Sequence, residues 1–105
     1  MGHGQQELVN FLKRRVFDPV LEADEHGRSE GERRKLADVK DATRAEIKRF
    51  EGYGSAREVV VNFKRDLNSE PARKIHRESK ALRLPTLNDV RDEFEAKAHD
   101  LGLDS

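Results

Sequence analysis

The stretch RLPTLNDVRDEF, residues 83–94, lies between two segments whose apolar residues recur at helical spacing. The residue before a proline avoids helical backbone, so we expect Leu84 to be extended and the preceding helix to end there. Thr86, with Asp89 three residues later, has the pattern of an N-cap that begins a new helix. Such a break is typical of a DNA-binding helix-turn-helix, but it also occurs in a simple helical bundle.

Charge distinguishes these two interpretations. Residues 86–105 carry six acidic side chains and two basic ones, which leaves a net charge of −4. A recognition helix contacts phosphates through cations or neutral donors, so DNA would repel a helix this acidic. Asp89, Asp92 and Glu93 instead stabilise the positive end of the helix that follows Thr86. We therefore interpret the Leu-Pro turn as a feature of the fold and not as a DNA-binding motif.

The N-terminal segment is predicted to be a strongly apolar helix that begins near Gln5. Phe11 and Phe17 fall outside its main apolar face. This pattern indicates either the central, most buried helix of the domain or a helix with a second apolar face for a partner. Pro19 leaves two possibilities, because it could kink one continuous helix or follow Asp18 as the first residue of a separate one. The main apolar face consists of Leu8, Val9, Leu12, Val16 and Val20.

Two capping patterns define the middle of the chain. Ser29 with Glu32 follows a polar loop and predicts a helix that runs to about Glu51. Ser55 with Glu58 follows the Gly-Tyr-Gly corner and predicts the next helix. The apolar residues behind each cap recur at steps of three and four, which agrees with helix in both segments.

A further helix is expected to begin at Ser69, with Pro71 in its first turn, and to end before Pro85. The run Val-Val-Val at residues 59–61 is the one place where a strand competes, because β-branched side chains are stiff in helices. The cap at Ser55 and the apolar spacing favour helix there.

Together these patterns predict an all-α protein, a single compact bundle of four to five helices with short connections. We expect residues 1–105 to form one helical domain in which residues 1–4 and 102–105 are frayed. The apolar stripe expected to bury the last helix consists of Leu87, Val90, Phe94, Ala98 and Leu101.

Composition excludes several classes of protein. The formal net charge is zero although 40% of the residues are charged, so no global field attracts nucleic acid or an anionic membrane. The chain has no cysteine, which excludes disulfides and thiolate chemistry. No segment approaches the run of about 18 apolar residues that a transmembrane helix needs. We expect a cytoplasmic protein with no membrane association.

No motif indicates catalysis or metal binding. If Gly27 takes the sixth position of a calcium-binding loop, Arg33 falls at the twelfth, where a glutamate ligand is required. The Gly-x-Gly at residues 52–54 follows a helix and lacks the strand that precedes a dinucleotide site. The sequence therefore predicts no enzymatic activity, cofactor or metal site. The four histidines are isolated in sequence: His3, His26, His76 and His99.

A basic stripe is the main candidate for an interaction surface. Residues 55–85 contain eight basic and four acidic side chains, a net charge of +4. We expect the stripe to lie opposite the apolar face of its helix, with His76 exposed, and it has three interpretations. It is a solvated face, a docking surface for an acidic protein or a second copy of the chain, or a contact surface for the backbone of RNA or DNA. The stripe consists of Arg73, His76, Arg77, Lys80 and Arg83.

For function, the sequence favours a non-catalytic protein-interaction or accessory module. Its working surface would be the basic face of the third and fourth predicted helices, the acidic C-terminal helix, or both. The alternative is a nucleic-acid-binding module that contacts phosphates through the basic stripe. No aromatic residue lies between Phe63 and Phe94 to stack on bases, which disfavours the alternative.

Overall fold

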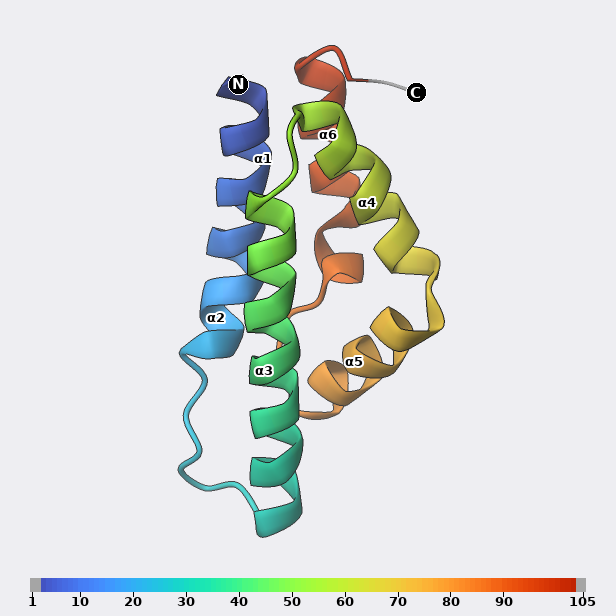
Figure 1. The fold of residues 1–105 in the computed structure, drawn as a ribbon. Helices are drawn as coiled ribbons and strands as arrows, with labels where there is room; N and C mark the ends of the chain where they lie inside the picture. Colours follow the sequence, from blue (N-terminus) through green and yellow to red (C-terminus); the bar gives the residue numbers. More distant parts are fainter. Residues whose placement is uncertain (1–2, 104–105) are drawn as a thin grey trace.

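The capping patterns and apolar spacing produce five consecutive helices and no strand in the computed structural model, which describes residues 3–103 (Figure 1). The expected all-α bundle with short connections is confirmed. Of the ends expected to be frayed, residues 1–2 and 104–105 lie outside the described part of the chain, and helical backbone begins at His3.

The first helix continues through Pro19 and is not divided into two separate helices. It consists of α1 (His3–Leu12), the π-helical turn η1 (Lys13–Phe17) and α2 (Asp18–Leu21), and its backbone is continuous. The Asp18 N–H donates to the carbonyl of Lys13, five residues back. Proline has no N–H, and its ring clashes with the carbonyl four residues earlier, so the widened turn lets the helix pass Pro19 without ending.

The next three helices follow their predicted caps. The helix α3 (Glu30–Glu51) begins with the Ser29–Glu32 capping box, in which each residue's N–H donates to the other's side chain. The helix α4 (Ala56–Asn68) is capped by Ser55, while the Glu58 carboxylate accepts from the Gly54 N–H and not from Ser55. The helix α5 (Glu70–Ala81) is capped by Ser69.

The last helix begins more tightly than expected. A 3₁₀ turn, η2 (Leu87–Val90), precedes α6 (Arg91–Asp100). The Thr86 N–H donates to the Asp89 carboxylate at 3.0 Å, as the capping pattern predicts.

Two groups of apolar side chains form the core. The larger joins α1, η1, α3, α4 and α6, and its rings connect the helices: Phe63 stacks on Phe94 with centroids 3.9 Å apart, and Phe11 lies 6.4 Å from Phe94. The first helix is buried by its own domain, as one of the two interpretations held. Leu101 departs from the predicted stripe because it is 36% exposed. The smaller group contains Val20, Leu36, Val39 and Leu82.

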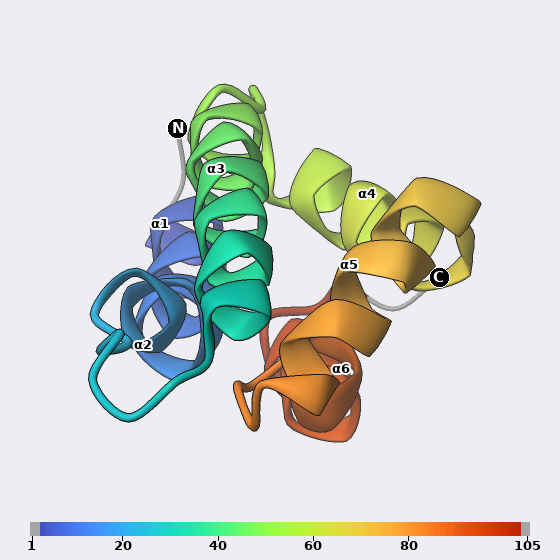
Figure 2. The same cartoon turned by 90° about the horizontal axis from the view of Figure 1, so that it is seen from below.

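The helices are arranged in two layers around these groups. The first helix and α3 run side by side in opposite directions, and α4, α5 and α6 lie on the other side of α3 when seen from below (Figures 1 and 2). α5 crosses at a steep angle and packs on α3 and α4. No helix among residues 3–103 combines the length and apolarity needed to cross a lipid bilayer.

Candidate functional site

A groove of about 580 Å³ runs along α5, with the turn before α6 as its other wall. Three cations of the predicted stripe line it together with His76. The opposite wall is neutral. We call this feature the α5 groove, and its residues are Arg73, His76, Arg77, Lys80, Ala81, Thr86 and Asn88.

The helical turn explains why these cations share one groove. Arg73, Arg77 and Lys80 are four and three residues apart, so they follow one face of α5. No ion pair joins Arg73 to another of the residues 3–103. Arg77 lies 3.4 Å from Glu70 and Lys80 lies 3.4 Å from Asp89. Both cations remain well exposed, and exposed pairs of this kind contribute little free energy, so an anionic ligand can displace them.

A second hollow extends the α5 groove toward α4. It has a volume of about 510 Å³ and shares Arg73 and Asn88 with the groove. Lys64 and Arg91 add positive charge to its lining, and Glu95 adds one carboxylate. Positive charge therefore predominates beyond the three cations of α5.

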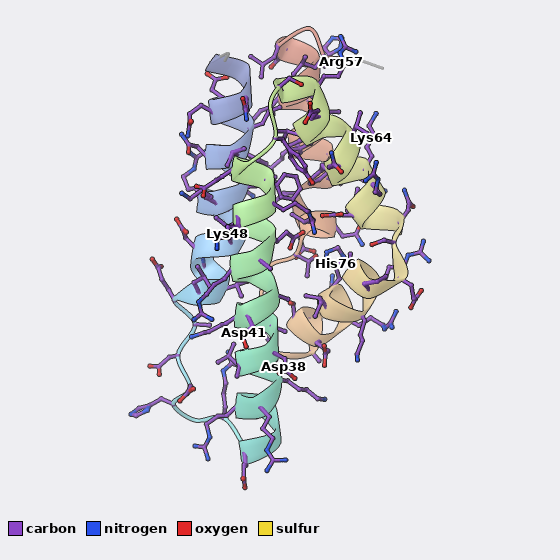
Figure 3. All side chains as sticks on the ribbon, viewed as in Figure 1. Asp38, Asp41, Lys48, Arg57, Lys64 and His76 are labelled. Atoms are coloured by element: carbon purple, nitrogen blue, oxygen red, sulfur yellow. The ribbon has the colours of Figure 1, made fainter. Side chains whose placement is uncertain are left out.

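His76 is not exposed, which corrects the sequence prediction. Its ring is half-buried on the inner side of α5, and Nδ1 is buried without a hydrogen-bond partner (Figure 3). Burial lowers the pKa of His76, while the negative charges of Asp66 and Asp89 oppose that shift. The imidazole is therefore neutral at neutral pH, although two carboxylates face it.

A buried polar cluster that was not predicted from the sequence lies behind His76. The side chains of Glu46 and Asp66 are 16% and 12% exposed. Arg49 donates a hydrogen bond to Asp66, donates another to the Tyr53 hydroxyl at 3.1 Å and lies 3.7 Å from Glu46. The cluster borders a cleft of about 240 Å³, which His76 also lines. His76 thus separates this cleft from the α5 groove.

One carboxyl of the cluster carries a proton at neutral pH. Burial, together with the hydrogen bond and the negative charge of Asp66, raises the pKa of Glu46 to about 8, although Arg49 opposes the shift. The neutral Glu46 carboxyl donates to the Asp66 carboxylate, which Arg49 also contacts. A single proton therefore stabilises two carboxyl groups that would otherwise repel each other.

Arg83 does not belong to the α5 groove, although it was predicted to be part of the stripe. It follows the end of α5 with a positive φ of 65°, and this turn directs it to a different hollow beside the loop at residues 24–28. The Leu84 N–H donates to the carbonyl of Ser79, and the Arg83 N–H donates to that of Lys80. These two bonds form a Schellman motif, which reverses the chain immediately after the helix.

The acidic C-terminal helix is less available than its charge suggests. Arg15 holds Glu93 through two hydrogen bonds, one of them 2.9 Å long, and this lowers the pKa of Glu93. Asp89 is engaged by Thr86 and Lys80. Asp92 lies 3.4 Å from Arg91. Three carboxylates of this region thus have partners within the protein: Asp89, Asp92 and Glu93.

One signal in the sequence could have revealed that Asp66 is buried. It lies seven residues after Val59 and three after Phe63, so it falls on the apolar face of α4. A charged residue at such a position indicates a buried partner, and Arg49 supplies it. By contrast, Asp38 and Asp41, which the sequence places on a helix surface, are exposed on α3 (Figure 3).

The α5 groove presents cations and neutral polar groups, and no carboxylate is among its lining residues. Among residues 3–103, no group of three or more histidine, aspartate or glutamate side chains is placed to hold a metal ion. The groove offers two guanidinium groups and an ammonium group, with the Thr86 and Asn88 side chains opposite.

No family model matches the chain, and no curated protein or solved structure shows significant similarity to it.

Proposed function

We propose that this chain is a non-catalytic interaction module that docks an acidic segment of another protein in the α5 groove. One observation supports the proposal above all: three exposed cations at helical spacing line a single groove that no carboxylate lines. Charge complementarity of this kind determines which partner binds and speeds its association.

The nature of the groove favours a protein segment over nucleic acid. No phenylalanine, tyrosine or tryptophan lines it for stacking on bases. A second copy of the chain is a poorer occupant, since Glu93 would first have to leave Arg15 of η1, and Asp89 would have to leave Lys80 of α5.

The test measures binding of a labelled synthetic peptide of alternating Asp and Ser residues by fluorescence anisotropy at low salt. We expect the triple variant R73Q/R77Q/K80Q to bind at least about tenfold more weakly than the wild type, because three charge contacts are lost. The matched control is R33Q/R34Q/K35Q, which removes three exposed cations from the start of α3 and should bind like the wild type.

Two results would contradict the proposal. Equal loss of affinity in both triple variants would show that net charge, and not the α5 groove, attracts the peptide. Tighter binding of mixed-sequence duplex DNA or RNA than of the peptide, with loss of that binding in R73Q/R77Q/K80Q alone, would assign the groove to nucleic acid.

A further inference from the structure

We propose that His76 takes up a proton when an acidic segment fills the α5 groove, so that docking is stronger at mildly acidic pH. This inference rests on the docking function proposed above and adds its regulation. It starts from the position of the ring: His76 lines both the α5 groove and the inner cleft, and its Nδ1 has no hydrogen-bond partner. A buried nitrogen without a partner is costly to the folded state.

Burial of His76 outweighs the attraction of the two carboxylates near it. Asp66 faces it from α4 and Asp89 from η2, and both favour the protonated ring. Glu46 and Arg49 of α3 line the inner cleft behind it. On its own helix, three cations line the same groove: Arg73, Arg77 and Lys80.

An acidic occupant changes this balance in one direction. Its carboxylates offset the three groove cations and add negative charge beside the imidazole, so the protonated ring becomes the favoured form. Binding of the segment and binding of the proton then strengthen each other by the same factor, as thermodynamic linkage requires. The segment itself stays ionised, since ordinary aspartate carboxyls titrate near pH 4.

The experiment measures the affinity of the Asp-Ser peptide for wild type, H76Q and E46Q as a function of pH. For the wild type we expect affinity to rise about three- to tenfold between pH 8 and pH 6, in the range where histidine titrates. H76Q should bind about as weakly at both pH values as the wild type does at pH 8. E46Q should keep the rise, because Glu46 does not line the groove.

Calorimetry provides a readout that does not depend on a variant. The heat of peptide binding to wild type, measured in two buffers with different ionisation enthalpies, gives the number of protons taken up, which the expected rise in affinity sets at roughly 0.2–0.5 near pH 7. The proposal is wrong if no proton is taken up or if H76Q keeps the full pH dependence. Peptide binding that is groove-specific but independent of pH would overturn this inference and leave docking intact. Absence of binding at every pH would remove both.

Discussion

At the scale of single residues, burial controls the protonation state of Glu46. Its carboxyl lies next to Asp66 in a cleft between α3, α4 and α5 and is only 16% exposed, so a second negative charge there is poorly solvated. Arg49 compensates one carboxylate, and the proton on Glu46 removes the need to compensate the other. The cluster is therefore stable with one charge of each sign and is destabilised when that proton is lost.

This arrangement predicts how stability depends on pH. Because the pKa of Glu46 is raised from 4.5 to about 8, the folded state keeps a proton that the unfolded state has released between these values. Stability therefore falls as pH rises through this range. In E46Q the amide still donates to Asp66 but does not titrate. Urea unfolding should show that E46Q has a shallower pH dependence and is more stable than wild type above about pH 8, by a few kcal/mol.

A parallel pH dependence in the two proteins would contradict this assignment. The matched control is E51Q, since Glu51 lies on the same helix but is exposed and pairs with Lys13 at the surface. Its unfolding free energy should follow that of the wild type at every pH, within the small contribution of an exposed ion pair.

The position of His76 on its helix explains why its side chain was wrongly predicted to be exposed. Four-residue spacing puts it in line with Ala72 and Lys80, and three-residue spacing with Ser79, so it lies on the boundary between the apolar and basic faces of α5. A ring at such a boundary turns inward or outward according to what the neighbouring helices leave open. Periodicity within one helix contains no information about that space.

At the scale of elements, the end of α5 is formed by a backbone conformation that its sequence does not favour. Arg83 takes the left-handed position of a Schellman motif, where glycine is the usual residue. The end of α6 has the same two backbone bonds, with Gly102 in the equivalent place at a φ of 75°. The two turns thus provide a comparison of arginine and glycine within one chain.

Replacing Arg83 by glycine is expected to stabilise the protein. The substitution relieves the cost of a side chain in left-handed backbone, offset in part by the greater freedom of glycine in the unfolded chain, for a net gain of roughly 0.5–1 kcal/mol. Urea unfolding measures the gain, and R83A serves as the control because it removes the charge but keeps a side chain. An equal gain in R83A would show that charge, and not backbone strain, is responsible. Peptide docking should be unchanged in R83G, since Arg83 lies outside the groove.

Elements with local signals were predictable, and those that depend on distant contacts were not. The caps at Ser29, Ser55 and Ser69 begin the helices that follow them, because a cap is a bond between residues three apart. The π turn before Pro19 has no such local signal. It lets the helix continue past the proline, and the continued helix is stabilised by a distant contact, in which Phe17 packs on Phe50 of α3 with centroids 6.0 Å apart. The sequence predicted the three cations of the α5 groove because they follow one face of a single helix. It did not predict the opposite wall, because Thr86 and Asn88 come from another segment of the chain.

At the scale of the whole molecule, apolar burial is distributed unevenly. The larger core group occupies the end of the bundle where α1, α4 and α6 meet, and the four residues of the smaller group hold the other end. The first turns of α3 and the loop before it extend beyond the remaining helices (Figure 1). Within its own bounds α5 fully buries a single side chain, Ser79, while Leu82 anchors it just after its end. The helix that carries the proposed site therefore buries fewer side chains than any of the other four helices.

Hydrogen exchange should reveal this difference. Local opening has a lower free energy where less apolar surface is buried, so we expect α5 amides to exchange at least about tenfold faster than those of α1, which buries Leu8, Val9, Phe11 and Leu12. Saturating Asp-Ser peptide should slow exchange in α5 and η2 and leave α1 unchanged, because the ligand binds only the closed form of the groove. Equal protection of α5 and α1 in the free protein would contradict the uneven distribution of stability. Slowing throughout the chain would mean that α5 opens only when the whole bundle unfolds, and docking would then stabilise the entire fold and not one helix.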